Sequence, residues 1–380
     1  MKHWVFSLFS LMLLVVCSSE TFGHKPSDSY LRLTIDENTI QGQWDIALRD
    51  LDHAISLDGN DDGRITWGEV RARHDAIASY ALSRLLLTEA RSPCSNKVEN
   101  HLVDHHSDGS YAVLQFSMHC PTIPKSLNFH YGLFFNIDPL HRGLLQISHQ
   151  SRTQTAVFSP EQPTVQLDLT TTSSWREFLE FAREGVWHIW IGYDHILFLI
   201  SLLLPAVLWW RAGQWQAVKS FGQVFREVLS IITAFTLAHS ITLSVAASEF
   251  VTLPSRWVES VIAGSVVLAA LHNLFPMIRV RRWIVGFVFG LVHGFGFASV
   301  LADLTLPATS MFVALAGFNI GVEVGQLFIV GVFLPLAYAI RHSWTYRCLA
   351  VQVGSVCIVG LASIWFIERS LNISLSNWLW

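Results

Sequence analysis

The segment Trp187–Leu208 constrains this chain most, because it is apolar and long enough to cross a bilayer as one helix. Its first half nevertheless carries His188, Asp194 and His195. Ionisable groups at that depth are costly unless they face a protein interior and find partners there. The sequence therefore predicts a bundle of membrane helices around a polar site.

Six apolar segments predict a multi-pass helical membrane domain over residues 185–370. The expected spans are residues 186–208, 225–247, 257–276, 282–302, 311–339 and 348–368. The loops after the first, third and fifth segments carry Lys or Arg, whereas the loops between them hold only Arg256. By the positive-inside rule, the basic loops face the cytoplasm. The N-terminal part and the C-terminus are then expected outside.

The first residues have the features of a secretory signal peptide, predicted over residues 1–23. A basic residue precedes the apolar run Val5–Val16, and small and polar residues follow it. Cleavage after Gly23 is expected to leave His24 first, whereas a lipoprotein signal ending at Cys17 fits poorly because valine precedes it. This agrees with the loop charges and predicts the inner membrane of a bacterium, with the N-terminal domain on the periplasmic side.

Residues 24–170 predict a mainly-β, sandwich-like exported domain with a helical insertion. Apolar and polar residues alternate in Ser29–Asp36 and Thr39–Leu48, as in a β-hairpin. Helix-like spacing follows in Leu48–Ser56 and Trp67–Ala90. Residues 171–184 are expected to form a linker and an amphipathic helix along the membrane surface. Alternation returns in four later segments: Tyr111–His119, Leu127–Ile137, Gly143–His149 and Thr164–Leu169.

Cys94 and Cys120 are the cysteines expected in the exported domain. Two cysteines in an oxidising compartment most simply pair, so the sequence predicts a disulfide between them. Two free thiols, or a metal site that includes the neighbouring His119, are the alternatives.

Residues 58–69, DGNDDGRITWGE, match the calcium-binding loop of an EF-hand. Gly63 stands at the sixth position, where the loop turns sharply, and helices are expected on both sides. The sequence therefore predicts bound Ca²⁺, and a structural clip is favoured over a calcium sensor. The six ligand positions are held by Asp58, Asn60, Asp62, Arg64, Thr66 and Glu69.

Histidines and carboxylates recur within the predicted spans, and several share one helix face. Imidazoles with one or two carboxylates suit Ni²⁺, Co²⁺, Zn²⁺ or Cu²⁺. A hydrogen-bonded network that only fixes helix packing is the alternative. The candidate ligands are His188, Asp194, His195, His239, His293 and Glu323, and the supporting polar residues are Thr236, Ser240, His272, Asn319 and Gln326.

Four stretches of the membrane part resemble the motifs of the HupE/UreJ family of membrane proteins. They are HIWIGYDHILFLISLLLP, FTLAHSITL, LVHGFGFAS and FNIGVEVGQ, in this order within residues 185–340. The family is associated with hydrogenase and urease gene sets and is regarded as nickel permeases. The simple members lack the exported domain and commonly have proline where Ile189 stands here. The resemblance implies metal-binding roles for His188, Asp194, His195, His239, His293 and Glu323.

Three functions stay open on these observations. The first is a transition-metal permease without enzymatic activity, whose exported domain captures the ion with help from His24 and from His101, Asp104, His105 and His106. For that last cluster, a solvated polar turn is the preferred interpretation. The second is an intramembrane zinc-dependent hydrolase with Glu323 as general base. The third is a membrane-anchored protein for interaction or assembly in the cell envelope.

The expected partners follow from these hypotheses. They are the lipid bilayer, a transition-metal ion, and a metallochaperone or another envelope protein. The formal net charge of -4 provides no basic surface, so nucleic acid is not expected as a partner.

Overall fold

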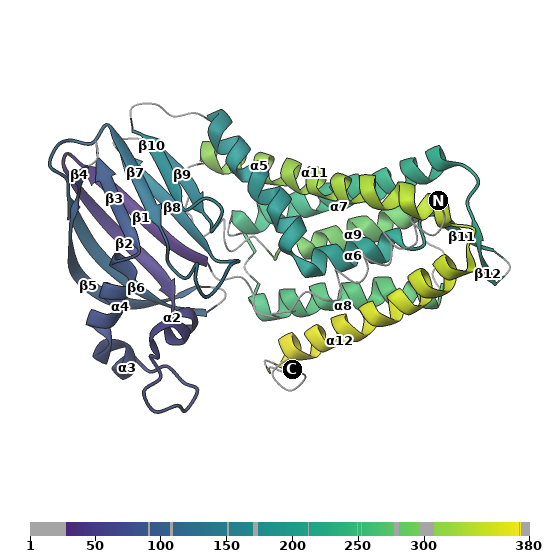
Figure 1. The fold of residues 1–380 in the computed structure, drawn as a ribbon, viewed down its shortest axis with the longest axis horizontal. Coiled ribbons are helices and arrows are strands. Elements are labelled where there is room, and N and C mark those ends of the chain that lie inside the picture. Colours follow the sequence, from purple (N-terminus) through teal and green to yellow (C-terminus); the bar gives the residue numbers. More distant parts are fainter. Residues whose placement is uncertain are drawn as a thin grey trace. The chain divides into compact units, whose positions relative to one another are not determined.

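A strand-rich unit is followed along the chain by a helical unit (Figure 1). The first unit holds most of residues 25–180 and the second most of residues 181–371. The structure is a computed structural model that describes residues 28–89, 92–106, 109–149, 152–169, 174–211, 213–248, 250–251, 253–276, 281–296, 308–371 and 373. The predicted signal peptide and His24 therefore lie outside the described residues.

The strand-rich unit contains two sheets. In the six-stranded sheet, ordered β5-β6-β2-β1-β8-β9, the predicted hairpin of β1 and β2 lies at the centre, and β1 also pairs in parallel with β8. The four-stranded sheet has the order β10-β7-β3-β4. The strands are β1 (Asp28–Asp36), β2 (Thr39–Ala47), β3 (Leu85–Glu89), β4 (Ser92–Pro93), β5 (Ser95–His106), β6 (Gly109–His119), β7 (Ser126–Tyr131), β8 (Arg142–His149), β9 (Arg152–Phe158) and β10 (Thr164–Asp168).

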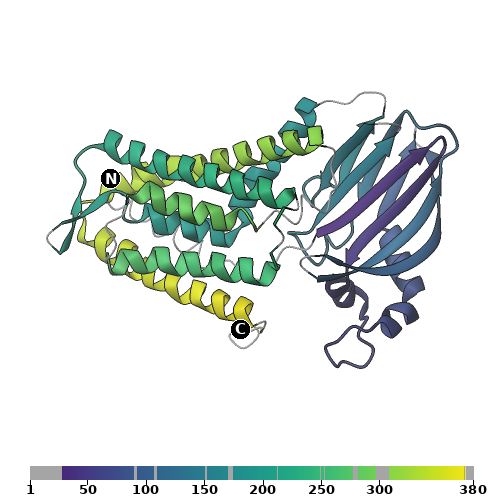
Figure 2. The ribbon, with the colours of Figure 1, turned by 180° about the vertical axis from the view of Figure 1, so that it is seen from behind.

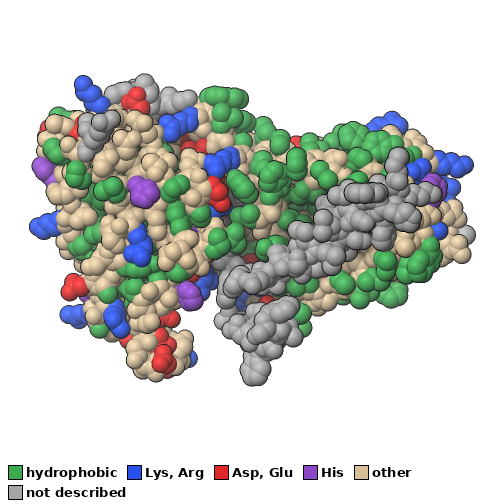
Figure 3. Space-filling model, viewed as in Figure 1, with side chains coloured by type: hydrophobic (Ala, Val, Ile, Leu, Met, Phe, Trp, Pro, Cys, Tyr) green, Lys and Arg blue, Asp and Glu red, His purple; other side chains and the backbone are tan. Residues whose placement is uncertain are grey.

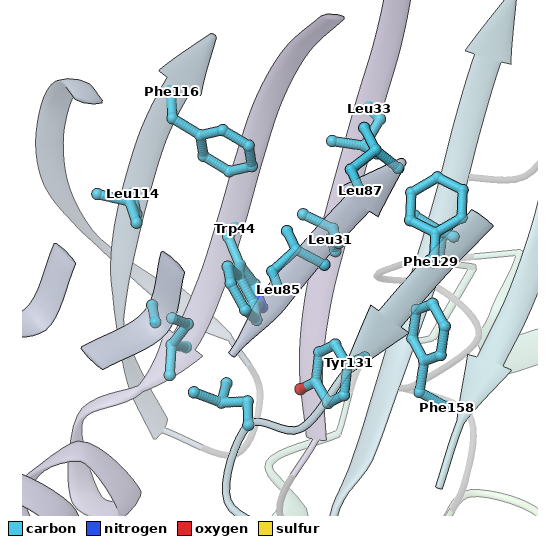
Figure 4. Packing of buried hydrophobic residues seen from close by; sticks show 14 of the residues in the cluster. Leu31, Leu33, Trp44, Leu85, Leu87, Leu114, Phe116, Phe129, Tyr131 and Phe158 are labelled. Carbon is cyan, nitrogen blue, oxygen red and sulfur yellow. The ribbon is translucent and has the colours of Figure 1, made fainter. Parts of the chain in front are cut away.

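Side chains from both sheets point into one apolar core (Figure 4). Leu31, Trp44 and Phe116 come from the six-stranded sheet, whereas Leu87 and Phe129 come from the four-stranded sheet, and all five are buried. Burying one such side chain stabilises the fold by about 1.5–3 kcal/mol. The shared core therefore holds the two sheets face to face, and the prediction of a mainly-β N-terminal region is confirmed.

The helical insertion follows β2 and consists of α2 (Leu48–Ile55), α3 (Trp67–Ala72) and α4 (His74–Leu82). The helix predicted over Trp67–Ala90 is wrong beyond Leu82, because Leu85–Glu89 form β3. Leu85, Leu86 and Leu87 are 4%, 52% and 2% exposed, which is the two-residue period of a strand. The predicted disulfide between Cys94 and Cys120 is confirmed and links the start of β5 to the end of β6.

The helical unit begins with a bent pair of helices. The expectation of one helix over Trp187–Leu208 is wrong, because α5 ends at Ile191 and α6 begins at Tyr193, and the two helices meet at 70°. Glycine is a poor helix former, and Gly192 adopts an extended backbone conformation at this break. The helices are α5 (Ser174–Ile191), α6 (Tyr193–Leu203), α7 (Phe221–Ala247), α8 (Ser255–Leu274), α9 (Arg282–His293), α11 (Ala308–Ile340), the π-helix η1 (Tyr346–Val353) and α12 (Gly354–Leu371).

Within the described residues, four helical segments are long and apolar enough to cross a membrane, and the bent pair would count as a fifth span. The four are α7, α8, α11 and the continuous helix formed by η1 and α12. The shorter α9 covers only the first part of the span expected over residues 282–302, and residues 297–307 lie outside the described part. Figures 1 and 2 show α8 and α12 side by side.

Glycines allow helix backbones in this unit to touch. A Cβ atom added at Gly321 of α11 would lie 1.9 Å from the carbonyl oxygen of Ala182 on α5. One added at Gly294, just after α9, would lie 2.0 Å from the Thr242 hydroxyl of α7. Small residues at such contacts are typical of helix packing in membranes. They bring α5, α7, α9 and α11 close enough for their polar side chains to meet.

Candidate metal centre

Three imidazoles from three helices meet inside the helical unit. His188 of α5, His195 of α6 and His239 of α7 each offer a ligand atom, and these atoms all lie within 4.8 Å of one another. His195 is 7% exposed and His239 is fully buried. The bend at Gly192 brings the His188 and His195 rings to 4.6 Å between centres. We call these three residues the imidazole group.

The hydrogen bonds of two members leave one nitrogen of each ring available. Asp194 accepts a hydrogen bond from Nδ1 of His195 at 2.9 Å, since a carboxylate only accepts. The amide nitrogen of Asn319 donates to the Leu315 carbonyl, so its oxygen faces Nδ1 of His239 at 3.2 Å and accepts from it. In the neutral form of both rings, Nε2 is then the nitrogen with the free lone pair, and it is buried with no hydrogen bond to the described residues. This is how metal-binding histidines are usually oriented.

A fourth imidazole, His293 at the end of α9, lies beside the group. Its ring centre is 4.9 Å from that of His195, and Phe198 and Phe235 pack against it. The Ser265 hydroxyl donates to the Ile262 carbonyl, so it accepts the 2.9 Å hydrogen bond from Nε2 of His293. In the neutral ring Nδ1 of His293 then has the free lone pair, and it has no hydrogen-bond partner among the described residues.

The negative charge at the group comes from Asp194. Its second carboxylate oxygen lies 3.9 Å from Nη1 of Arg369, near the end of α12. Arg369 also approaches the Glu259 carboxylate of α8 at 3.9 Å. Arg369 and Ser265 cannot be identified as site residues from the sequence. An arginine at a helix end suggests an anchor at the membrane interface, and a single serine in an apolar helix gives no indication of function.

The other polar residues predicted within the membrane helices are not members of the imidazole group. Glu323 accepts a hydrogen bond from the Thr233 hydroxyl at 3.0 Å and is not one of the three clustered ligands among the described residues. One turn further along α7, Thr236 donates to Gln326 at 3.4 Å, and Ser240 donates to the Thr236 carbonyl at 2.7 Å. The bonds to Glu323 and Gln326 tie α7 to α11, whereas that of Ser240 lies within α7. His272 lies on α8 and is not one of the clustered residues either.

The loop of residues 58–69 follows α2, and its last three residues form the start of α3, so helices flank it as the motif requires. The backbone N–H of Gly63 donates to Asp58 at 2.7 Å, and that of Gly59 donates to Glu69 at 3.0 Å. Gly63 has a φ of 75°, a conformation that favours glycine. Hydrogen bonds from the Thr66 backbone N–H and hydroxyl lower the pKa of the Glu69 carboxyl, which is therefore ionised at neutral pH.

The polar cluster predicted at residues 101–106 does not come together. Neighbouring side chains of β5 point to opposite faces of the sheet. Nε2 of His106 lies 3.3 Å from the Asp45 carboxylate, whereas Nδ1 of His105 lies 3.0 Å from the Ser110 hydroxyl. His101 meets a residue that the sequence does not point to, His74 at the start of α4.

Comparison with known proteins agrees with this membrane architecture. The sequence model described as HupE / UreJ protein matches residues 164–369, more than half of the chain. No match is found among curated proteins. The match spans the bent helix pair, the imidazole group and Arg369. The chain therefore belongs to the HupE / UreJ protein family.

Proposed function

We propose that this protein is a membrane permease for a divalent transition-metal ion of the nickel and cobalt class. The observation that carries the proposal is the imidazole group, in which one ligand atom from each of three helices lies within 4.8 Å of the other two. Hydrogen bonds through Nδ1 leave Nε2 of His195 and His239 available to an ion. Imidazole is a preferred ligand of such ions. The sequence motifs shared with nickel permeases favour Ni²⁺ and Co²⁺ over Zn²⁺. The ion is the transported substrate.

His293 provides the next ligand along a path through the helices. Its ring centre lies 4.9 Å from that of His195, about as close as the ring centre of His188 at 4.6 Å. An ion that exchanges one or two imidazoles at a time is never left bare in the apolar interior, where a charge is costly. Asp194 beside His195 offsets part of the positive charge. This short relay has the property that a permease needs, because it can both bind and release its ion.

The proposal includes a topology with six spans in the inner membrane of a bacterium. Basic side chains gather at the end of the helical unit that carries the hairpin of β11 (Leu208–Arg211) and β12 (Gln214–Ala217), at the right in Figure 3. Arg341 and Arg347 donate to backbone carbonyls of Val218 and Trp215 there. By the positive-inside rule, this end faces the cytoplasm. The strand-rich domain then faces the periplasm.

Uptake of Ni²⁺, Co²⁺ and Zn²⁺ into proteoliposomes tests the permease. We expect saturable uptake of Ni²⁺ or Co²⁺ that His195→Ala and His239→Ala abolish. His342→Ala is the matched control, because it removes an exposed histidine beyond the end of α11. Uptake that persists in both cluster variants contradicts the proposal, and so does stoichiometric zinc that is retained without any uptake.

We also propose that residues 58–69 bind Ca²⁺ as a structural ion of the strand-rich domain. All six ligand positions of the motif are filled, and the Asp58 and Glu69 side chains both turn toward the backbone of the loop. A ligand at a hundred times its dissociation constant stabilises the folded state by about 2.7 kcal/mol. Ca²⁺ should therefore raise the melting temperature of the wild type but not of Glu69→Gln. An equal rise in both contradicts the calcium site.

A further inference from the structure

We propose that His74 and His101 form a second transition-metal site, on the strand-rich domain, that takes the same divalent ion as the imidazole group. The site joins the helical insertion to the edge of the six-stranded sheet, because His74 begins α4 and His101 lies on the edge strand β5. The inference rests on the proposed function for the identity of the ion. It does not depend on that function for the existence of the site.

The geometry suits two ligands of one ion. The ring centres of His74 and His101 are 4.3 Å apart, with 46° between the ring planes. Two imidazoles that share an ion at the usual metal–nitrogen distance of about 2 Å have ring centres roughly 4–5 Å apart. Within the membrane part, the corresponding distance between His188 and His195 is 4.6 Å. The two pairs of rings are therefore spaced alike.

A second observation points to a ligand at this place. Nδ1 of His74 is inaccessible to solvent and has no hydrogen-bond partner among the described residues. A buried nitrogen of this kind is costly when nothing binds it. The Trp67 indole also packs against the His74 ring in a T-shaped arrangement, with 5.8 Å between ring centres. The indole fixes the ring without using its nitrogen.

The electrostatics around His101 favour a neutral ligand next to a carboxylate. Burial, and then the neighbouring His74, lower the pKa of His101, which favours the neutral imidazole over the charged one. Asp75, the residue after His74, is close enough to influence His101 with its negative charge. Two imidazoles and a nearby carboxylate suit Ni²⁺, Co²⁺, Cu²⁺ or Zn²⁺, whereas Ca²⁺ prefers oxygen ligands. The site is therefore chemically distinct from the loop of residues 58–69.

A site with two protein imidazoles leaves several coordination positions to water, so it exchanges its ion more readily than a site with three. Such a site fits capture of the ion outside the membrane, ahead of the imidazole group. Loss of the site should then raise the ion concentration needed for half-maximal uptake and leave the maximal rate unchanged.

Equilibrium dialysis with Ni²⁺ tests the site on the full-length protein at neutral pH with saturating Ca²⁺. The double variant His74→Phe/His101→Phe keeps an aromatic ring at both positions but cannot bind metal, and it should lose one equivalent of bound Ni²⁺. His105→Phe makes the same change on the same face of β5 and should lose none. His74→Gln and His101→Gln provide a second set if the phenylalanine variant does not fold, as judged by circular dichroism.

The outcomes separate this inference from the proposed function. Loss of one equivalent in the His74/His101 variants, with the equivalent that depends on His195 still bound, supports the second site. Unchanged binding in these variants, or an equal loss in His105→Phe, overturns it. If the second equivalent depends on His74 and His101 while His195→Ala leaves uptake intact, the second site stands and the permease proposal fails.

Discussion

Asn319 gives the sharpest test of how the imidazole group is oriented. In Asn319→Ala, the Nδ1–H of His239 loses its acceptor inside a fully buried environment where water cannot replace it. An unsatisfied buried donor costs about 1–3 kcal/mol. The alternative tautomer relieves this cost, but it places the proton on Nε2, where the metal binds. Either way, the ring becomes a poorer ligand.

The expected effect is a loss of about 10–100-fold in Ni²⁺ affinity, which is the usual result of removing such an orienting partner. A loss of this size corresponds to about 1.4–2.8 kcal/mol of binding free energy. Asn319→Asp keeps an oxygen toward His239 and should retain tight binding. The assay is equilibrium dialysis of purified protein with Ni²⁺, in the His74→Phe/His101→Phe background so that the strand-rich domain does not contribute.

Gln326→Ala is the matched control. Gln326 is buried on the same face of α11, and its side chain accepts a hydrogen bond from Thr236 of α7 rather than from an imidazole. If affinity in Asn319→Ala stays within about twofold of the parent protein, or if Gln326→Ala loses as much, the orientation argument is refuted and the residues only pack α7 against α11.

Three further predictions concern stability. Gly321→Ala should lower the free energy of unfolding by about 1–3 kcal/mol, because the new Cβ would lie 1.9 Å from the Ala182 carbonyl oxygen. Gly331→Ala is the control, because a Cβ there meets nothing within 4 Å. Equal melting temperatures of the two variants would contradict this packing. Replacing Cys94 and Cys120 with serine should destabilise the strand-rich domain in urea by about 3 kcal/mol, and a wild type that is insensitive to reductant would argue against this role of the disulfide. Burial raises the pKa of the Tyr131 hydroxyl well above its ordinary value of 10.0, so its contribution to stability is present below pH 10 and is lost as the pH rises further. Urea unfolding of the wild type should therefore show a steeper fall in stability above pH 10 than Tyr131→Phe, and parallel curves would disprove the assignment.

The sequence was sufficient to predict those helices and strands whose residue pattern is local. Strict alternation over residues 29–48 predicts the central hairpin, and the regular apolar spans predict α7, α8 and α11. Strand β5 was not predicted, because an exposed edge strand with the sequence SNKVENHLVDHH has no continuous apolar face. The three consecutive leucines at residues 85–87 fit a helix as well as a strand, and only their burial decides between the two.

The candidate site was predictable in its ligands but not in its geometry. The seven-residue spacing of His188 and His195 suggests a shared helix face, although the structure brings them together across a bend at Gly192 instead. Partners distant in sequence, such as Ser265 for His293, could not be predicted because nothing local marks them. The same is true of His74 and His101, which meet only because α4 packs against β5.

The central claim is that imidazoles of the membrane helices bind a transition-metal ion. X-ray absorption at the nickel K-edge tests it directly on Ni²⁺-loaded protein in the His74→Phe/His101→Phe background. The account predicts nitrogen ligands at about 2 Å with the outer-ring scattering of three imidazoles, which must fall when His239 is replaced by alanine. A spectrum of oxygen ligands only, or one that His239→Ala leaves unchanged, would contradict the claim.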